Sequence, residues 1–157
     1  MVYGAIDRAS EGFTDMQYIF AALGQRQRDY NWLITDADCT AATPEFAALL
    51  EQNYAWLTGE ELTAMVAQEN FQWIWAVLSG FPKHITQEEV LAYPLPAAID
   101  YTGFWHNPLT LQHPLAEVEI VPWDSSATLF LSRDAELVTA FRRAIPGSQD
   151  LAQYNAI

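Results

Sequence analysis

The sequence predicts one α+β domain over residues 1–157, with a mostly antiparallel or mixed sheet on which helices pack. Three observations carry this prediction. Threonines that are followed three residues later by Gln or Glu mark helix starts, because the two side chains can cap the first turn reciprocally. The apolar run at 71–78 is typical of a central strand that is buried on both faces. The apolar segments 116–123 and 128–132 flank Asp124-Ser125-Ser126, which is typical of a β-hairpin.

The residues before 71 predict alternating strands and helices. Aromatic and β-branched side chains favour strands, whereas capping residues and proline in a first turn favour helix starts. The predicted elements are a strand at 1–6, a helix opened by Thr14 and Gln17 and ended by Gly24, a strand at 30–35, a helix beginning at Thr43-Pro44, and a helix opened by Thr58 and Glu61.

The residues after 71 predict a strand, a short helix, a long connection, a hairpin and a last helix. Trp73 and Trp75 are two residues apart in the central strand, so we expect them on one face. The segment 94–114 is rich in proline but carries several aromatic residues, so we expect it to pack against the domain. The helices are those opened by Thr86 and Glu89, with Pro94 as the stop, and by Asp134.

The charge distribution is the strongest functional signal. The net charge is −13, although hydrophobic residues make up 51% of the chain. Between Arg28 and Arg133, Lys83 is the only fixed positive charge, while fourteen carboxylates lie in the same stretch. Such a surface repels nucleic acid and anionic membranes and attracts a basic protein partner. The sequence therefore predicts no nucleic-acid or membrane partner.

No catalytic residue and no cofactor are predicted. The sequence has no glycine-rich phosphate-binding motif and no nucleophile elbow. Cys39 is the single cysteine, and neighbouring acidic residues are expected to raise its pKa. The absence of paired cysteines and of an N-terminal signal pattern favours a cytoplasmic location. An enzyme is thus less favoured than a binding protein.

Two histidines give the alternative of a metal-assisted hydrolase. His106 and His113 are seven residues apart in the irregular segment, close to Glu117 and Glu119, which share one strand face. Two imidazoles and a carboxylate are a ligand set that zinc or iron can use. The spacing matches no established metal motif, so no metal is assigned.

Two tryptophans beside carboxylates predict a partner-binding surface. Trp105 and Trp123 lie in or next to loops, and we expect their rings to be exposed. A basic partner can use both cation–π contacts and charge attraction at such a site. The predicted partner-binding residues are Trp105, Glu117, Glu119, Trp123 and Asp124.

Three short segments resemble an uncharacterised family of small bacterial proteins with a domain of unknown function. The segments are Tyr30-Asn-Trp-Leu-Ile, Leu57-Thr-Gly-Glu-Glu-Leu62 and Trp123-Asp-Ser-Ser126. The resemblance implies a bacterial cytoplasmic origin, and it supplies no activity and no site residue.

Three hypotheses of different classes follow. The first is a small acidic protein-binding module, in its sharpest form an immunity-type protein that neutralises a basic toxin. The second is the metal-assisted hydrolase. The third is a self-associating structural domain with Trp105 at a dimer contact.

Overall fold

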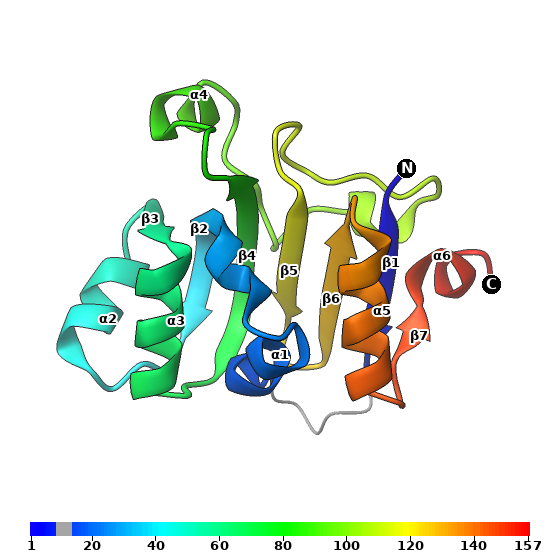
Figure 1. Ribbon diagram of the computed structural model, residues 1–157, viewed down its shortest axis with the longest axis horizontal. Helices are drawn as coiled ribbons and strands as arrows, with labels where there is room; N and C mark the ends of the chain where they lie inside the picture. Colours follow the sequence, from blue (N-terminus) through cyan, green and yellow to red (C-terminus); the bar gives the residue numbers. More distant parts are fainter. Residues whose placement is uncertain (9–13) are drawn as a thin grey trace.

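The computed structural model describes residues 1–8 and 14–157, and these form a single α+β domain (Figure 1). Within them, seven strands build one sheet in the order β3-β2-β4-β5-β6-β1-β7, and every neighbouring pair is antiparallel. The predicted fold class is therefore confirmed. The strands are β1 (Tyr3–Asp7), β2 (Tyr30–Cys39), β3 (Tyr54–Thr58), β4 (Trp73–Pro82), β5 (Val118–Trp123), β6 (Ala127–Ser132) and β7 (Gln149–Asp150).

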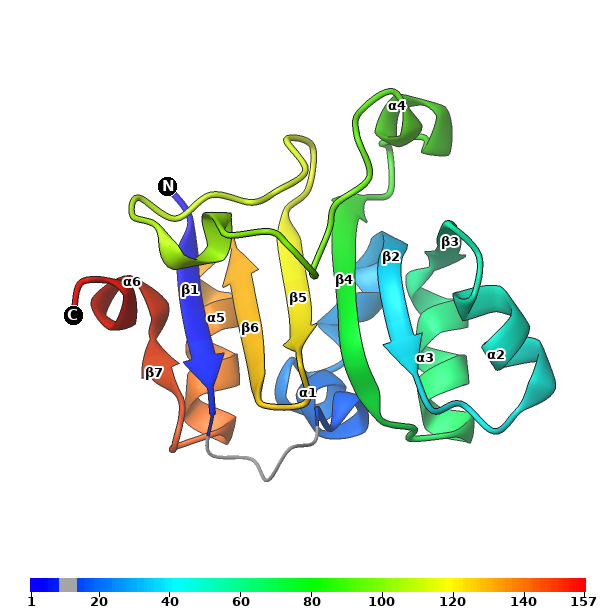
Figure 2. The same ribbon diagram turned by 180° about the vertical axis from the view of Figure 1, so that it is seen from behind.

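Helices and one long segment cover the two faces of the sheet. On one face, α1, α3 and α5 cover the strands, and α3 and α5 run roughly along the strand direction (Figure 1). On the other face, the segment 92–117 crosses β5, β6 and β1 (Figure 2). The helices are α1 (Met16–Ala22), α2 (Pro44–Leu50), α3 (Gly59–Gln68), α4 (Gln87–Leu91), α5 (Ala135–Ala144) and α6 (Leu151–Asn155), with 3-10 helices η1 (Arg26–Asp29) and η2 (Gly103–Trp105).

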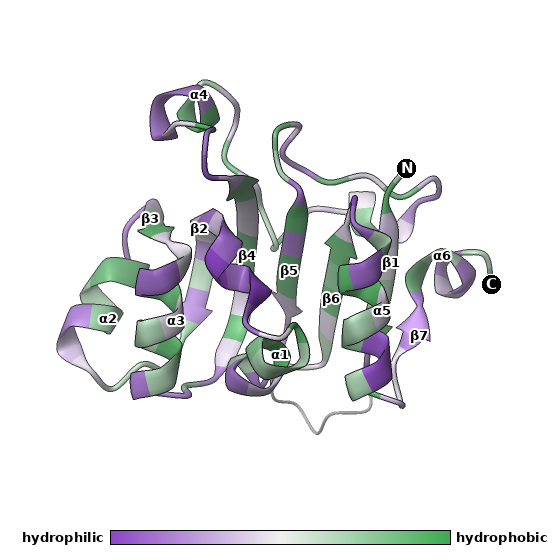
Figure 3. Cartoon of the chain, viewed as in Figure 1, coloured by the Kyte–Doolittle hydropathy of each residue, from purple (hydrophilic) through white to green (hydrophobic). Residues whose placement is uncertain are grey.

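Each face of the sheet has its own hydrophobic core. Trp32, Phe130 and Phe141 are fully buried on the helix-covered face. Phe81 and Phe104 are buried on the face covered by the segment 92–117. Figure 3 shows β5 and β6 as largely hydrophobic, whereas α5 has both hydrophobic and hydrophilic residues. Central strands buried on both faces explain why the apolar run at 71–78 lacks a polar alternation.

Two of the three predicted capping boxes are confirmed. Thr58 and Glu61 cap α3 reciprocally, and Thr86 with Glu89 does the same for α4. The prediction at Thr14 is wrong: Asp15 caps α1 by accepting a hydrogen bond from the backbone N–H of Tyr18 at 3.0 Å. The Thr14 hydroxyl is instead buried against the Thr128 hydroxyl of β6. The Thr14 hydroxyl therefore bonds a residue far away in the sequence instead of capping its own helix.

Two β-bulges change the side-chain alternation of β2 and β4. Asp36, with φ 53°, lies in the β2 bulge, and Ile74 is the extra residue in β4. Because a bulge shifts the two-residue period, Trp73 and Trp75 point to opposite faces. The prediction that they share a face is therefore wrong, and Trp75 joins the face that carries Trp123.

The segment 92–117 packs against the domain, and it contains the segment 94–114 that was predicted to be irregular and packed. Its backbone is held by side chains of the sheet: Asp36 Oδ2 accepts hydrogen bonds from the N–H groups of Ala98 and Ile99 at 2.8 and 2.9 Å. Within the segment, the side-chain amide of Gln112 accepts a hydrogen bond from the Ala97 N–H and donates one to the Ala97 C=O. The Gln112 N–H donates to Glu119 Oε2 at 2.8 Å. These contacts fix the segment over the second core.

Candidate functional site

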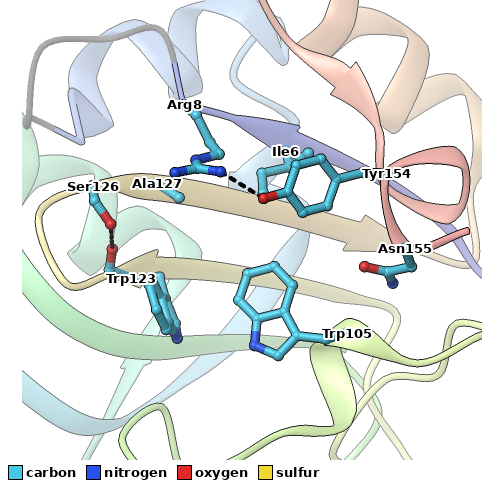
Figure 4. A pocket seen from close by; sticks show the side chains of 8 residues that line it. All are labelled: Ile6, Arg8, Trp105, Trp123, Ser126, Ala127, Tyr154 and Asn155. Carbon is cyan, nitrogen blue, oxygen red and sulfur yellow. Dashed lines mark hydrogen bonds between the residues drawn. The ribbon is translucent and has the colours of Figure 1, made fainter. Parts of the chain in front are cut away.

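An aromatic pocket of about 400 Å³ lies where the segment 92–117 meets β1, the β5–β6 hairpin and α6 (Figure 4). The indoles of Trp105 and Trp123 and the ring of Tyr154 form its walls. We call this site the aromatic pocket; its lining residues are Ile6, Arg8, Trp105, Trp123, Ser126, Ala127, Tyr154 and Asn155.

The rings of the pocket form a connected series of aromatic contacts. The Trp105 and Trp123 centroids are 5.3 Å apart at an interplanar angle of 87°, and Trp123 meets Trp75 edge-on at 5.2 Å. Trp105 also contacts Tyr154, with centroids 6.2 Å apart. Trp105 and Trp123 are half-buried rather than exposed, because they pack on each other. Edge-to-face geometry of this kind stabilises the pair beyond its buried area.

The pocket contains one fixed charge, which is positive. Arg8 follows β1, and its Nη1 donates a hydrogen bond to the Tyr154 hydroxyl at 2.6 Å. The guanidinium carbon lies 5.9 Å from the centroid of the Tyr154 ring, within cation–π range. Among residues 1–8 and 14–157, no aspartate or glutamate lines the pocket, and Asp124 is exposed in the turn next to Trp123. The lining therefore differs in charge from the surface that the sequence predicts around Trp105 and Trp123.

The β5–β6 hairpin positions Trp123. Asp124 and Ser125 both have positive φ, and the Ser126 N–H donates to the Trp123 carbonyl at 3.0 Å, as in a tight two-residue turn. The Ser125 N–H donates to the carbonyl of the bulged Ile74 at 3.1 Å, which ties the turn to β4. The bulge therefore places Trp75 and Trp123 in contact.

Hydrogen bonds between the segment 92–117 and α6 position the other wall. Asn155 Nδ2 donates to the Phe104 carbonyl at 2.9 Å, and Asn107 Nδ2 donates to the Ala152 carbonyl at 2.8 Å. A Cβ at Gly103 would overlap the ring of Tyr101, so glycine lets this ring pack against the turn before Trp105. Trp105 is thus held against Tyr154 by contacts that join distant parts of the sequence.

A second concave region, the acidic groove, runs beside β3 on the opposite side of the molecule. Its two parts have volumes of about 580 and 590 Å³ and share residues 51–53. In the part of the chain that the structure describes, no Lys or Arg lines either part. Its defining residues are the carboxylates Asp36, Glu51 and Asp100, the apolar Leu95 and Ile99, and the β3 residues Tyr54, Ala55 and Trp56.

The surrounding part of the chain is strongly acidic. Between residues 30 and 101, Lys83 is the only Lys or Arg, and it pairs with Glu60 at 2.6 Å. Some of the carboxylates form hydrogen bonds within the domain. Glu69, for example, accepts hydrogen bonds from the N–H groups of Ala42 and Thr43. The ten carboxylates in this stretch are Asp36, Asp38, Glu45, Glu51, Glu60, Glu61, Glu69, Glu88, Glu89 and Asp100.

The predicted partner-binding residues do not form one surface. Trp105 and Trp123 are brought together, and Asp124 is exposed in the turn beside them. Glu117 is half-buried, whereas Glu119 is fully buried. The prediction that Glu119 contacts a partner is wrong, because its strand position faces the core under the segment 92–117 rather than solvent.

Burial raises the pKa of the Glu119 carboxyl from 4.5 to about 7, although the Gln112 N–H opposes this shift by binding Oε2. Its cross-strand neighbour is Ser79, which is also fully buried. Glu119 Oε1 and Ser79 Oγ have no hydrogen-bond partner among the described residues. A protonated carboxyl can donate a hydrogen bond, which a carboxylate cannot.

The two histidines are not arranged as the alternative of a metal-assisted hydrolase requires. His113 is buried; Nδ1 accepts a hydrogen bond from the Leu115 N–H at 3.1 Å, and Nε2 lies 2.9 Å from the Val90 carbonyl. Burial lowers the pKa of His113, and both ring nitrogens are used by backbone groups. His106 is exposed. Among residues 1–8 and 14–157, no three His, Cys, Asp or Glu side chains are placed to hold a metal ion.

The predicted rise in the pKa of Cys39 is confirmed in direction. Its pKa is raised, first by burial and also by the negative charge of Asp38. A thiol with a raised pKa is a poor nucleophile at neutral pH.

Sequence reasoning missed Arg8, Tyr154 and Asn155. Arg8 and Tyr154 are 146 residues apart, so no local pattern joins them. A polar side chain just after an apolar strand and an aromatic residue in the C-terminal helix are too common to predict a pocket.

Comparison with known proteins finds no matching family model, no matching curated protein and no matching solved structure. The resemblance to a family of small bacterial proteins stays a prediction. In the part of the chain that the structure describes, no helix has the length and apolar character needed to cross a membrane.

Proposed function

We propose that this chain is an acidic protein-binding module that holds a basic partner in the acidic groove. The single observation that carries the proposal is the lining of the groove, whose described residues include three carboxylates and two exposed apolar side chains but no Lys or Arg. A partner segment with Arg or Lys beside an apolar residue matches this lining in charge and hydrophobicity.

Two of the three carboxylates of the groove are free to meet a partner. Glu51 and Asp100 are exposed, and neither carboxylate forms an ion pair or a side-chain hydrogen bond among the described residues. The third, Asp36, accepts hydrogen bonds from two backbone N–H groups through Oδ2. Because only Lys83 lies nearby in sequence, the repulsion among these charges is relieved when a cationic partner binds.

The apolar side chains of the groove supply an anchor. Leu95 is 40% exposed and Ile99 is 42% exposed, and both lie on the segment that Asp36 holds in place. Large apolar side chains that a fixed backbone keeps on the surface are typical of interaction sites. Contact with them would add buried apolar area to the charge attraction.

The edge of β3 supplies backbone groups. β3 pairs with β2 on one side, and the groove is lined by Ala55 and Trp56, whose side chains belong to opposite faces of the sheet. The groove therefore follows the free edge of the strand, where an extended segment can add as a further strand. A second copy of this chain is a poor candidate, because it would bring carboxylates against carboxylates.

The test uses a defined probe, a capped peptide in which Arg and Val alternate, with a Glu–Val peptide of the same length as its counterpart. We expect the basic peptide to bind and to slow hydrogen exchange of the β3 amides. Its affinity should fall as salt is added. The double variant Glu51→Lys with Asp100→Lys should bind about tenfold more weakly.

The matched control makes the same change of charge at two exposed positions outside the groove. It carries Glu136→Lys and Glu45→Lys in one chain. If this control weakens binding as much as the groove variant, the effect is one of net charge and the groove is not the site. The sharper form of the proposal, an immunity-type role, predicts that the groove variant also fails to protect against a basic toxin enzyme.

A further inference from the structure

We infer that the aromatic pocket binds a small organic carboxylate with a flat apolar body, such as an aromatic acid. This site is separate from the acidic groove and shares no lining residue with it. The inference concerns an additional ligand and does not depend on the basic partner.

The shape and lining of the pocket fit a planar molecule. Its volume of about 400 Å³ lies within the range of small-molecule sites, which are mostly apolar with a few polar groups that fix orientation. The indoles of Trp105 and Trp123 are nearly perpendicular, and the side chains of Ile6 and Ala127 add an apolar surface. A flat ring can meet one indole face-on and the other edge-on, as aromatic rings prefer.

The charge of the pocket selects the sign of the ligand. The chain has 20 carboxylates and 7 Lys and Arg residues, yet the described residues that line this pocket include Arg8 and no carboxylate. A guanidinium presents five N–H donors in a planar fork that matches a carboxylate. Arg8 attracts an anionic ligand and repels a cationic one.

The binding groups are already ordered. Tyr154 holds Arg8 through a hydrogen bond at 2.6 Å, and Asn155 ties the backbone beside Trp105 to α6 (Figure 4). The side chain of Asn155 also lines the pocket. Because these side chains are held before a ligand arrives, little entropy is lost when it binds.

The test compares three probes with one indole ring and different charges: indole-3-acetate, indole-3-acetamide and tryptamine. Titration is followed by NMR of the indole N–H signals, assigned by substitution. We expect indole-3-acetate to shift the Trp105 and Trp123 signals with saturation and to bind about tenfold more tightly than the amide. Tryptamine should bind most weakly.

The variant Arg8→Gln should remove the preference for the acetate over the amide, while Arg28→Gln, at an exposed position in η1, should keep it. Shifts that do not saturate with any probe, or a preference for tryptamine, would overturn the inference. Arg8→Gln should leave binding of the Arg–Val peptide unchanged, and the double groove variant should leave binding of indole-3-acetate unchanged. The two proposals can therefore fail separately.

Discussion

Replacing Glu119 with glutamine tests the consequences of a buried carboxyl in the sheet. Glu119 is fully buried beside Ser79, and its Oε2 accepts a hydrogen bond from the Gln112 N–H. In Glu119→Gln, the amide oxygen can keep the bond from Gln112, and the NH₂ group can donate toward Ser79. The amide has nearly the shape of the carboxyl but cannot ionise.

The magnitude follows from the pKa of Glu119, which burial raises from 4.5 to about 7. Because the folded-state pKa is higher than that of the unfolded chain, the folded protein binds more protons between these two values. Its free energy of unfolding therefore falls as pH rises through this window. At about 1.4 kcal/mol per pKa unit, the loss is about 3 kcal/mol once the pH exceeds the folded-state pKa.

The assay is urea unfolding of the wild type and Glu119→Gln at about pH 5 and about pH 8.5. We expect the variant to be more stable than the wild type at the higher pH by up to about 3 kcal/mol, which moves the midpoint by about 1–3 M urea. Near pH 5 the difference should be small. Self-repulsion and the titration of other groups affect both proteins and cancel in the comparison.

Glu117→Gln is the matched control, since it removes the same charge from a half-buried position just before β5. This control should change the pH dependence of the free energy of unfolding much less than Glu119→Gln does. If the midpoints of wild type and Glu119→Gln move in parallel between the two pH values, Glu119 does not titrate in this window and the reasoning is refuted.

Two further substitutions test the packing around α3. Gly59→Ala should destabilise the protein by about 1–3 kcal/mol, because the new Cβ would overlap the backbone of Gln27 and Arg28, which cannot move away freely; an unchanged urea midpoint contradicts this. Thr58→Ala should cost about 1 kcal/mol by removing the side-chain cap of α3, measured as a lower thermal midpoint, and Thr58→Ser should restore most of it.

The helix starts and the hairpin could be predicted because the physics that fixes them is local. The Thr58–Glu61 and Thr86–Glu89 pairs satisfy N–H groups within one turn. The turn at 124–126 likewise uses residues suited to positive φ. By contrast, β3 was missed, because its five residues form a strand only by pairing with β2. Short edge strands carry little signal of their own.

The candidate sites were less predictable than the elements. The sequence grouped Trp105 with Trp123, and the structure places their rings in contact. The acidic character of the region between Arg28 and Arg133 follows from the residue types alone. The sequence wrongly placed Glu119 on the surface, because strand alternation gives two faces without saying which segment covers each. It also joined the tryptophans to the carboxylates, whereas the structure places Arg8 beside the tryptophans.

By itself, the sequence determined the α+β class, most helix starts and the acidic character of the protein, since these depend on composition and on residues a few positions apart. Only the tertiary structure decided the bulge at Ile74 that turns Trp75 toward Trp123, and the meeting of Arg8 with Tyr154. The physical reason is that strand register and the packing of a long segment are fixed by contacts between distant residues. Such contacts leave no periodic trace in the chain.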